Sequence, residues 1–372
     1  MRMTKGNLSK TDTFKPMTFP LFGFINKRRS RIIRFYCIGW TLAFIFLSIV
    51  RGVGTVELGN IQLSFEISLL IAFTMGPIVG LISGGAQILT EERIYKHVSI
   101  RRLLLINLLY FYLFIMVVVL ISYGIFTLYL DLNINITSFA FDRGSFAIYF
   151  YVIVVDLLLA MLRQVNLMLG EGKLGELLRG KFYTPREEKR IFMFLDLQAS
   201  TELAERLGHV NYSMLIQDCF NDLGIALKNE AEIYQYVGDE AVLTWNLSEG
   251  LKNENCLKAY YNFAALLQRN SDVYQKKYNC MPFFKAGLHS GVVTVTEVGK
   301  YKKEIAYHGD TINTAARIQG QCNALESELL ISEKLKNELA STNFTYTAMG
   351  SIPLKGKKEN VSIYAVQQGV LV

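Results

Sequence analysis

The sequence predicts two folded parts in one chain: an N-terminal domain of four transmembrane helices and a C-terminal α+β domain with a ferredoxin-like sheet. Three observations carry this prediction. Hydrophobic residues make up 51% of the 372 residues and charged residues only 19%, whereas ordinary soluble domains carry about 25% charged residues. The composition changes abruptly near residue 170. Beyond that point the elements open in the order strand–helix–strand–strand–helix–strand, which is the ferredoxin-like pattern.

Four long apolar stretches precede the change in composition. They are Ile32–Val50, Leu63–Ser83, Leu103–Leu130 and Phe146–Leu169. Each is close to or above the length of about 20 residues that crosses a bilayer as a helix. A signal peptide does not fit the first stretch, because a basic tail over residues 1–30 precedes it and three more stretches follow. We therefore expect a transmembrane domain over residues 31–169. Buried helices of a large soluble protein are the alternative, but these would show polar faces.

Basic residues flank these stretches on alternate sides. They gather before the first stretch, between the second and third, and around the end of the fourth: Lys27, Arg28, Arg29, Arg31, Arg93, Lys96, Arg101, Arg102, Arg163, Lys173, Arg179 and Lys181. The positive-inside rule then places both termini and the C-terminal domain in the cytosol, in a multi-pass protein of the inner (plasma) membrane. The lipid bilayer is thus an expected partner. These flanks also explain the net charge of +7, so no nucleic-acid partner is expected.

Two features inside the transmembrane stretches are unusual. Gly76, Gly80 and Gly84 recur every fourth residue, which puts them on one helix face and predicts close helix packing. Such a face could also help two chains to pair. Asp156 lies deep in the fourth stretch, where a carboxylate is costly unless it is paired or faces the bundle interior. A ligand-sensing role and a purely structural role for Asp156 both remain open, and the ligand that the membrane domain would sense is unknown.

A helix-forming linker over residues 170–187 leads into the α+β domain, residues 188–368, and we interpret it as the signalling joint. Strands are expected at Arg190–Leu197, Ala231–Val237, Ala241–Asn246, Phe283–His289, Val292–Val298, Glu328–Ile331, Phe344–Met349 and Val361–Val366. Helices are expected at Thr201–Leu207, Asn211–Asn229, Ala259–Tyr278, Thr311–Gln319 and Glu333–Ala340. The five cysteines form no C-x-x-C pair, so neither a disulfide framework nor a zinc site is predicted.

Two aspartates form the first candidate site. Asp196 ends the first strand and Asp239 lies at the tip of a Gly-Asp hairpin. In a ferredoxin-like sheet the first and central strands are neighbours, so these carboxylates can share divalent metals. Oxygen-rich coordination suits Mg²⁺ or Mn²⁺. The backbone N–H groups from Gln198 to Thr201 open a helix and could cradle phosphates. Either aspartate alone is weak evidence, since aspartates are common in turns and caps.

A second candidate site lies on the helix expected at residues 311–319. Asn313 and Arg317 are four residues apart, so they share one helix face. Ala315 and Ala316 allow close packing behind them. An amide and a guanidinium aimed together suit a ribose and a phosphate. A surface helix with a solvated arginine is an equally plain interpretation of this segment taken alone.

Four motifs occur together in a fixed order. They are Phe-x-Asp-x-x-x-x-Thr (194–201), Gly-Asp (238–239), Gly-Leu-His-Ser-Gly (287–291) and Gly-Asp-x-x-Asn-x-Ala-Ala-Arg (309–317). In this combination the chain resembles the catalytic domain of class III adenylate/guanylate cyclases. The resemblance covers about residues 188–368. It implies an adenylate cyclase, a lyase that converts ATP to 3′,5′-cyclic AMP and pyrophosphate for intracellular signalling, with two Mg²⁺ or Mn²⁺ ions per site.

The resemblance also implies roles for single residues. Asp196 and Asp239 would hold the two metal ions, with the carbonyl of Leu197 assisting. Asn313 would orient the ribose, and Arg317 would stabilise the transition state at the α-phosphate. Lys355 or Lys357 would contact the terminal phosphates. In this family the metal site and the Asn/Arg pair come from opposite subunits, so a homodimer with two equivalent sites is implied.

Two positions depart from the family's pattern. Adenylate cyclases of this type usually read adenine with a Lys four residues before the second metal Asp and an Asp or Thr seven before the Asn. This chain has Gln235 and Ala306 there, and it does not match the guanylate cyclase pattern either. The Gln235 amide could bond either purine, because it both donates and accepts. ATP is the expected substrate and GTP the alternative. Tyr307, His308 or Lys303 could supply the missing contacts.

Other classes of protein fit less well. Diguanylate cyclases share the fold core, but they need a Gly-Gly-Asp/Glu-Glu-Phe turn and lack the Asn-x-x-x-Arg helix. A non-catalytic membrane receptor that binds nucleotide without turnover is compatible with the altered purine positions, although both aspartates, Asn313 and Arg317 argue against it. A transporter with a regulatory domain has only Asp156 to support it.

Overall fold

The computed structural model describes residues 27–52, 64–91, 100–130, 135–339, 343–353 and 360–369. It divides into two compact units, Met1–Asp156 and Leu157–Val372. Several of the residues and segments that carried predictions lie outside the described residues: the basic tail up to residue 26, Arg93, Lys96, Lys355 and Lys357.

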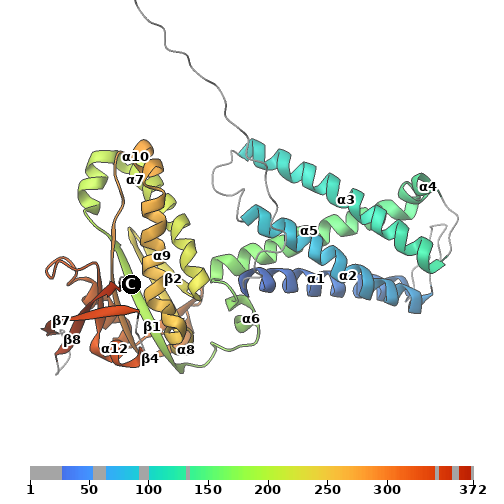
Figure 1. Ribbon diagram of the computed structural model, residues 1–372. Coiled ribbons are helices and arrows are strands. Elements are labelled where there is room, and N and C mark those ends of the chain that lie inside the picture. The colour runs from blue at the N-terminus through green and yellow to red at the C-terminus, as the bar shows by residue number, and fades with distance from the viewer. Residues whose placement is uncertain are drawn as a thin grey trace, which may run out of the picture. The chain divides into compact units, whose positions relative to one another are not determined.

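Long apolar helices dominate the N-terminal part (Figure 1). They are α1 (Lys27–Gly52), α2 (Phe65–Leu89), α3 (Ile100–Leu130) and α5 (Arg143–Leu169), with a short α4 (Ile136–Ala140) before α5. Four segments of these helices are long and apolar enough to cross a membrane: Arg28–Gly52, Phe65–Leu89, Leu109–Leu128 and Gly144–Leu169. The predicted set of four candidate membrane helices is therefore confirmed.

The glycine face of α2 packs directly on α1. A Cβ atom added to Gly76 would lie 2.5 Å from the Cα of Thr41, and one added to Gly80 would lie 2.4 Å from the Cα of Cys37. Real Cβ atoms do not approach that closely, so only glycine allows the two backbones to come this near. The predicted close helix packing is confirmed. Its partner is α1 of the same chain, which fills this face and leaves no room there for a second chain.

Asp156 faces the interior of the helix bundle. Its side chain is 4% exposed and accepts hydrogen bonds from the Ser83 hydroxyl on α2 at 2.5 Å and from the Tyr110 hydroxyl on α3 at 3.3 Å. The ring of Tyr110 stacks on Phe114, which in turn contacts Trp40 of α1. The carboxyl group is therefore held by neutral hydroxyl donors from two neighbouring helices.

The C-terminal unit is built on a mixed sheet of eight strands in the described residues. The strands are β1 (Arg186–Leu197), β2 (Glu232–Val237), β3 (Glu240–Asn246), β4 (Phe284–Val298), β5 (Glu304–His308), β6 (Leu329–Ser332), β7 (Phe344–Ile352) and β8 (Val361–Gln368). Their order is β2-β3-β1-β4-β6-β8-β7, with β5 paired to β4. The first four strands have the predicted ferredoxin-like arrangement, in which β1 lies between β3 and β4.

Helices cover both faces of this sheet (Figure 1). They are α6 (Lys173–Leu178), α7 (Ser200–Leu223), α8 (Leu247–Leu251), α9 (Asn255–Arg269), α10 (Ser271–Tyr278), α11 (Asp310–Gln319), α12 (Glu333–Glu338) and the 3₁₀ turns η2 (Gly224–Asn229) and η3 (Lys252–Glu254). Helices α7, α9 and α10 enclose the main core with alternate residues of β1, β3 and β4. Helix α11 covers part of the opposite face, together with Phe182 of the linker.

Three details differ from the predictions. Residues 284–298 form one continuous strand, not two strands that meet at Ser290 and Gly291, because β4 pairs with β1 from Phe284 to Val295. Strand β5 was not predicted. The single helix expected at Ala259–Tyr278 is divided into α9 and α10. The break expected between the two helices before and after Gly208 is present, because Gly208 within α7 has a non-helical φ of 73°.

Candidate active site

Strand pairing brings the two predicted metal aspartates to the same edge of the sheet. Asp196 lies near the end of β1, directly across from Glu240 at the start of β3. Asp239 precedes Glu240 in the two-residue turn between β2 and β3, and Gly238 supplies the positive φ of 63° that this turn needs. Three carboxylates therefore gather where β1 ends and the hairpin turns.

The pKa values of two of these carboxyl groups, Asp196 and Glu240, are raised. Burial, and secondarily the neighbouring Asp239, raises the pKa of the Asp196 carboxyl. Burial, together with Asp196 and Asp239, raises the pKa of Glu240 to about 6. Like charges held together in a half-buried place favour whatever neutralises them, a proton or a cation. The edge is therefore electrostatically prepared for a positive ion.

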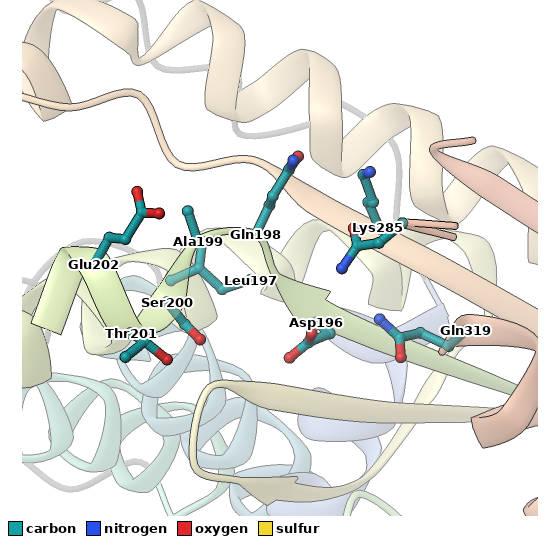
Figure 2. Close-up of a pocket in the computed structure, with 10 residues that line it drawn as sticks. Asp196, Leu197, Gln198, Ala199, Ser200, Thr201, Glu202, Lys285 and Gln319 are labelled. Carbon is teal, nitrogen blue, oxygen red and sulfur yellow. The ribbon is translucent and has the colours of Figure 1, made fainter. Parts of the chain in front are cut away.

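A pocket of about 290 Å³ opens beside Asp196 (Figure 2). It is lined by Asp196, Leu197, Gln198, Ala199, Ser200, Thr201, Glu202, Lys285, Gln319 and Asn323. Lys285 reaches it because β4 runs antiparallel to β1 and places Lys285 directly across from Asp196. Figure 2 shows the Gln319 amide turned toward the Asp196 carboxylate, and a hydrogen bond from Gln319 lowers the pKa of that carboxyl against the effect of burial.

The start of α7 forms one wall of this pocket. Ala199 caps the helix in a left-handed conformation with a φ of 55°, so the chain turns sharply between β1 and α7. The first N–H groups of the helix, at Ser200, Thr201 and Glu202, have no acceptor within the helix. The predicted cradle is one amide shorter than expected, because the N–H of Gln198 donates to the carbonyl of Phe283 at 2.9 Å. Thr201 does line the pocket.

The glycines of the Gly-Leu-His-Ser-Gly motif make room for α11. A Cβ atom on Gly287 would lie 2.1 Å from the backbone nitrogen of Gln319, and one on Gly291 would lie 2.3 Å from the Thr311 hydroxyl oxygen. The Thr311 hydroxyl also donates to the carbonyl of Val292 at 2.8 Å. Both ends of α11 are thus fixed to β4, which sets the position of the Asn313 and Arg317 side chains.

Asn313 and Arg317 lie on the side of α11 that the core does not use. Asn313 is exposed and Arg317 is half-buried. The Nη1 atom of Arg317 is buried and has no hydrogen-bond partner among the described residues, which leaves a donor ready for an anion. Neither residue is among those that line the pocket beside Asp196.

The two predicted base-contacting positions lie on β2 and β5. Gln235 is exposed and pairs across from Val242, whereas Ala306 pairs across from Thr296. The strands approach at Tyr234 and Tyr307, whose ring centroids are 5.1 Å apart. Tyr307 is buried in that contact. Ala306, the residue before it, therefore points to the other face of β5. His308 is exposed, and the exposed Lys303 pairs with Glu297.

Sequence reasoning missed Lys285 and Gln319. Both reach the pocket through tertiary structure: Lys285 by the register of β4 against β1, and Gln319 by the packing of α11 on Gly287. A usable signal was present for Lys285, since a lysine near the start of a buried strand, two residues before the Gly-Leu-His-Ser-Gly motif, calls for a nearby anion.

The residues present fit a hard divalent cation. Asp196 and Asp239 offer carboxylate oxygens and Leu197 a backbone carbonyl, which are the ligand types that Mg²⁺ and Mn²⁺ prefer. Among the described residues, no three His, Cys, Asp or Glu side chains lie together in metal-binding geometry. Two aspartates and one backbone carbonyl match Mg²⁺, which keeps several water or phosphate ligands and uses only one or two carboxylates.

Comparison with known proteins agrees with this fold and these motifs. Residues 182–368, half of the chain, match the family described as the adenylate and guanylate cyclase catalytic domain, and the chain belongs to that family. It is 31% identical over 210 residues to adenylate cyclase 2 of Rhizobium meliloti (strain 1021). The matched region covers 56% of this chain and 58% of the relative. It is 25% identical over 187 residues to an adenylate cyclase of Anabaena cylindrica, which covers 47% of this chain and 36% of the relative.

A solved structure has the same fold. A bacterial light-regulated adenylyl cyclase superposes with a TM-score of 0.51 at 17% identity, over 58% of this chain and 64% of that one. The chain thus spans between about a third and two thirds of the length of the proteins that it matches.

Proposed function

We propose that this protein is a membrane-bound adenylate cyclase that makes 3′,5′-cyclic AMP and pyrophosphate from ATP for intracellular signalling. The observation that carries the proposal is the cluster of Asp196, Asp239 and Glu240 beside a pocket that also holds Lys285 and the start of α7. Acidic groups suit metal ions, and a lysine with free helix N–H groups suits a polyphosphate. The two kinds of group lie side by side, as a metal–triphosphate complex requires.

Each residue has a defined task in this proposal. Asp196 and Asp239, with the Leu197 carbonyl, would hold two Mg²⁺ or Mn²⁺ ions. When bound, such ions lower the pKa of the ribose 3′-hydroxyl and offset charge on the phosphates. Lys285 and the N–H groups of α7 bind the triphosphate. Lys355 or Lys357 would contact the terminal phosphates.

The chemical step is an in-line displacement. The 3′-hydroxyl gives its proton to solvent water and its oxygen bonds to the α-phosphorus, while the bond from that phosphorus to the bridging oxygen breaks and pyrophosphate leaves with that electron pair. Asn313 orients the ribose for this attack. Arg317 neutralises the charge that develops on the α-phosphate oxygens. Its buried Nη1 has no hydrogen-bond partner among the described residues, which is consistent with this role.

A homodimer would complete the site. Asn313 and Arg317 do not line the pocket of their own chain, which supports a second copy that brings such a pair to Asp196 and Asp239. Two equivalent sites would result. The substrates of the relatives support ATP, although Gln235 can bond adenine or guanine, and GTP stays as the second candidate.

The membrane part and linker extend this proposal. Residues 31–169 would form the transmembrane domain, residues 170–187 the signalling linker and residues 188–368 the catalytic domain. Both termini and the catalytic domain would lie in the cytosol, at the inner (plasma) membrane.

The test uses the full chain in membrane vesicles with Mn²⁺. ATP and GTP are supplied separately, and both cyclic products are measured for the wild type, Asp239→Ala and the control Asp272→Asn, which changes an exposed residue of α10. Cyclic AMP from ATP, lost only in Asp239→Ala, is the expected result. Cyclic GMP as the main product would reassign the enzyme as a guanylate cyclase. Bound nucleotide with no cyclic product would identify a non-catalytic receptor.

A further inference from the structure

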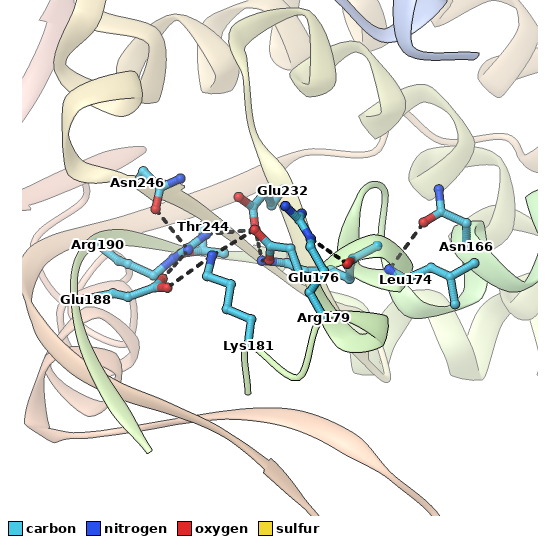
Figure 3. A network of polar contacts seen from close by, with 12 residues as sticks. Asn166, Leu174, Glu176, Arg179, Lys181, Glu188, Arg190, Glu232, Thr244 and Asn246 are labelled. Carbon is cyan, nitrogen blue, oxygen red and sulfur yellow. Dashed lines mark hydrogen bonds and ion pairs between the residues drawn. The ribbon is translucent and has the colours of Figure 1, made fainter. Parts of the chain in front are cut away.

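A buried arginine, Arg190, lies near the middle of β1, six residues before Asp196. Arg190 is 1% exposed, and its guanidinium is surrounded by partners from several elements (Figure 3). It pairs with Glu188 at 2.8 Å and with Glu232 of β2 at 2.8 Å. It donates to the Thr244 hydroxyl at 3.1 Å and to the Asn246 side-chain oxygen at 3.2 Å, both on β3. A planar guanidinium is the side chain that can satisfy so many acceptors at once.

The linker joins the same network. Lys173 of α6 lies 3.1 Å from the Glu232 carboxylate oxygen that also binds Arg190. Lys181 lies 2.7 Å from Glu176 and 3.7 Å from Glu188. Three cations thus face three carboxylates, and the network carries no net charge. Balance of this kind is what makes a buried set of charges tolerable.

The network also touches the two strands that carry the base-contacting positions. Glu232 lies three residues before Gln235 on β2. The guanidinium of Arg190 lies 4.9 Å from the ring centre of Tyr307 on β5, and Tyr307 is the neighbour of Ala306. The rings of Tyr307 and Tyr234 are in contact. Arg190 therefore contacts both strands while lying away from the metal edge.

We propose that Arg190 is a positioning residue for the nucleotide base, which fixes β2 through Glu232 and β5 through Tyr307. This inference rests on the proposed function and deepens it. The network holds the two strands at one spacing, and Lys173 of the linker shares the carboxylate that holds β2. A change in this network alters the fit of the purine, whereas the metal and phosphate groups stay in place.

The experiment compares Arg190→Lys with wild type in the full-length protein in membrane vesicles. Lysine keeps the positive charge but lacks the planar guanidinium with its several N–H donors. It therefore cannot bind Glu232, Glu188 and β3 at the same time. We expect the KM for ATP to rise about tenfold, with kcat reduced less than about threefold, because the misplaced strands weaken binding and not the chemical step. The ratio of kcat/KM for ATP to kcat/KM for GTP should become smaller. Glu232→Gln should act in the same direction.

The matched control is Lys277→Met, which breaks the Lys277–Asp218 pair of 2.7 Å elsewhere in the same unit and should leave KM unchanged. A merely structural role for Arg190 predicts the opposite split: less active protein, hence lower apparent kcat, at an unchanged KM, and that result would overturn the proposal. Direct binding of non-cyclisable ATP and GTP analogues gives a second measurement. If wild type binds nucleotide without making cyclic product, the proposed function fails, while weaker binding by Arg190→Lys still supports the positioning role and equal binding refutes it.

Discussion

The N-terminal unit and the C-terminal unit each bury a polar centre, and they satisfy it by opposite means. In the first, Asp156 receives hydrogen bonds from two neutral hydroxyls, those of Ser83 and Tyr110. In the second, Arg190 lies among carboxylates that balance its charge. Hydroxyl donors serve an acid whether or not it carries a proton, whereas a guanidinium never loses its charge and needs counter-charges.

The two units also differ in how their backbones are held together. Helices α1 and α2 rely on glycines that admit direct backbone contact, since lipid offers no hydrophobic gain for helix association. The C-terminal unit relies on a sheet with a large apolar core. Charge is unbalanced at the carboxylate edge around Asp196, which is where function is proposed. Uncompensated charge thus lies where the metal ions are proposed to bind, whereas compensated charge, as around Arg190, holds neighbouring strands in place.

The largest expected effect separates these two kinds of charge. Asp196→Asn should lower cyclase activity on the order of 10³-fold, because a proposed metal ligand is lost. It should leave the thermal unfolding temperature equal or higher, since a crowded carboxylate is removed. Activity assays and unfolding curves of the same preparation test both points. A clear loss of stability would mean that this edge is structural and would break the comparison.

Next in size is the glycine contact of the membrane part. Gly80→Ala places a methyl group against the α1 backbone and should destabilise the protein by about 1–3 kcal/mol, the usual cost of overpacking. Gly85→Ala is the matched control, because among the described residues no atom of another element lies within 4 Å of a Cβ at that position. Thermal unfolding of both variants in detergent gives the answer. Equal stability would show that α1 and α2 are not held by backbone contact.

A smaller effect is expected from acid. Burial tends to raise the pKa of Glu232, but the nearby charges of Arg190 and Lys173 outweigh it and hold the pKa below its usual value. A lowered folded-state pKa gives stability that is present above the unfolded pKa of about 4.3 and is lost as pH falls further. Wild type should therefore exceed Glu232→Gln in stability at pH 7 by about 1–2 kcal/mol. This difference in stability should shrink below about pH 4. Unfolding curves of both proteins, measured from pH 7 down to below pH 4, test this. A difference that stays constant would contradict a stabilising role for the Glu232 charge.

The smallest effect concerns Asp156. Asparagine has nearly the same shape: its amide oxygen can accept from the Ser83 hydroxyl, and its amide N–H can donate to the Tyr110 oxygen in place of the bond that Tyr110 donates now. Asp156→Asn should therefore change the stability by less than about 1 kcal/mol. Asp156→Leu, which leaves both hydroxyls without their acceptor, should cost more. A large loss with asparagine would show that the carboxylate charge itself is needed, and the contrast with Arg190 would disappear.

Much of the fold could be predicted because its signals are local. Four apolar stretches, the order of strands and helices and the motifs around Asp196, Asp239, Asn313 and Arg317 all come from short windows of sequence. The continuous strand β4 could not be predicted this way. Ser290 and Gly291 resemble a turn, but pairing with β1 on one side keeps the strand extended, and Gly291 serves the contact with Thr311.

Other parts depended on contacts distant in sequence. Lys285 and Gln319 reach the pocket only through strand register and helix packing. Arg190 reads locally as a charged residue at the start of a strand, yet its partners Glu232 and Thr244 come from β2 and β3. A buried charge network of this kind has no sequence signal of its own, because each member alone looks like a surface residue.

The central place of β1 has a consequence for motion on slow timescales. From residue 190 to residue 196 this strand is paired on both sides, with β3 and with β4, so its amide protons should exchange with solvent only when the whole sheet opens. Strands β2 and β5 each pair on one side in the described residues and should exchange sooner. Asp196 thus sits at the end of a slowly exchanging strand, while Gln235 and Ala306 sit on strands that exchange sooner. A change in these two edge strands would therefore alter the proposed base preference and leave Asp196 in place.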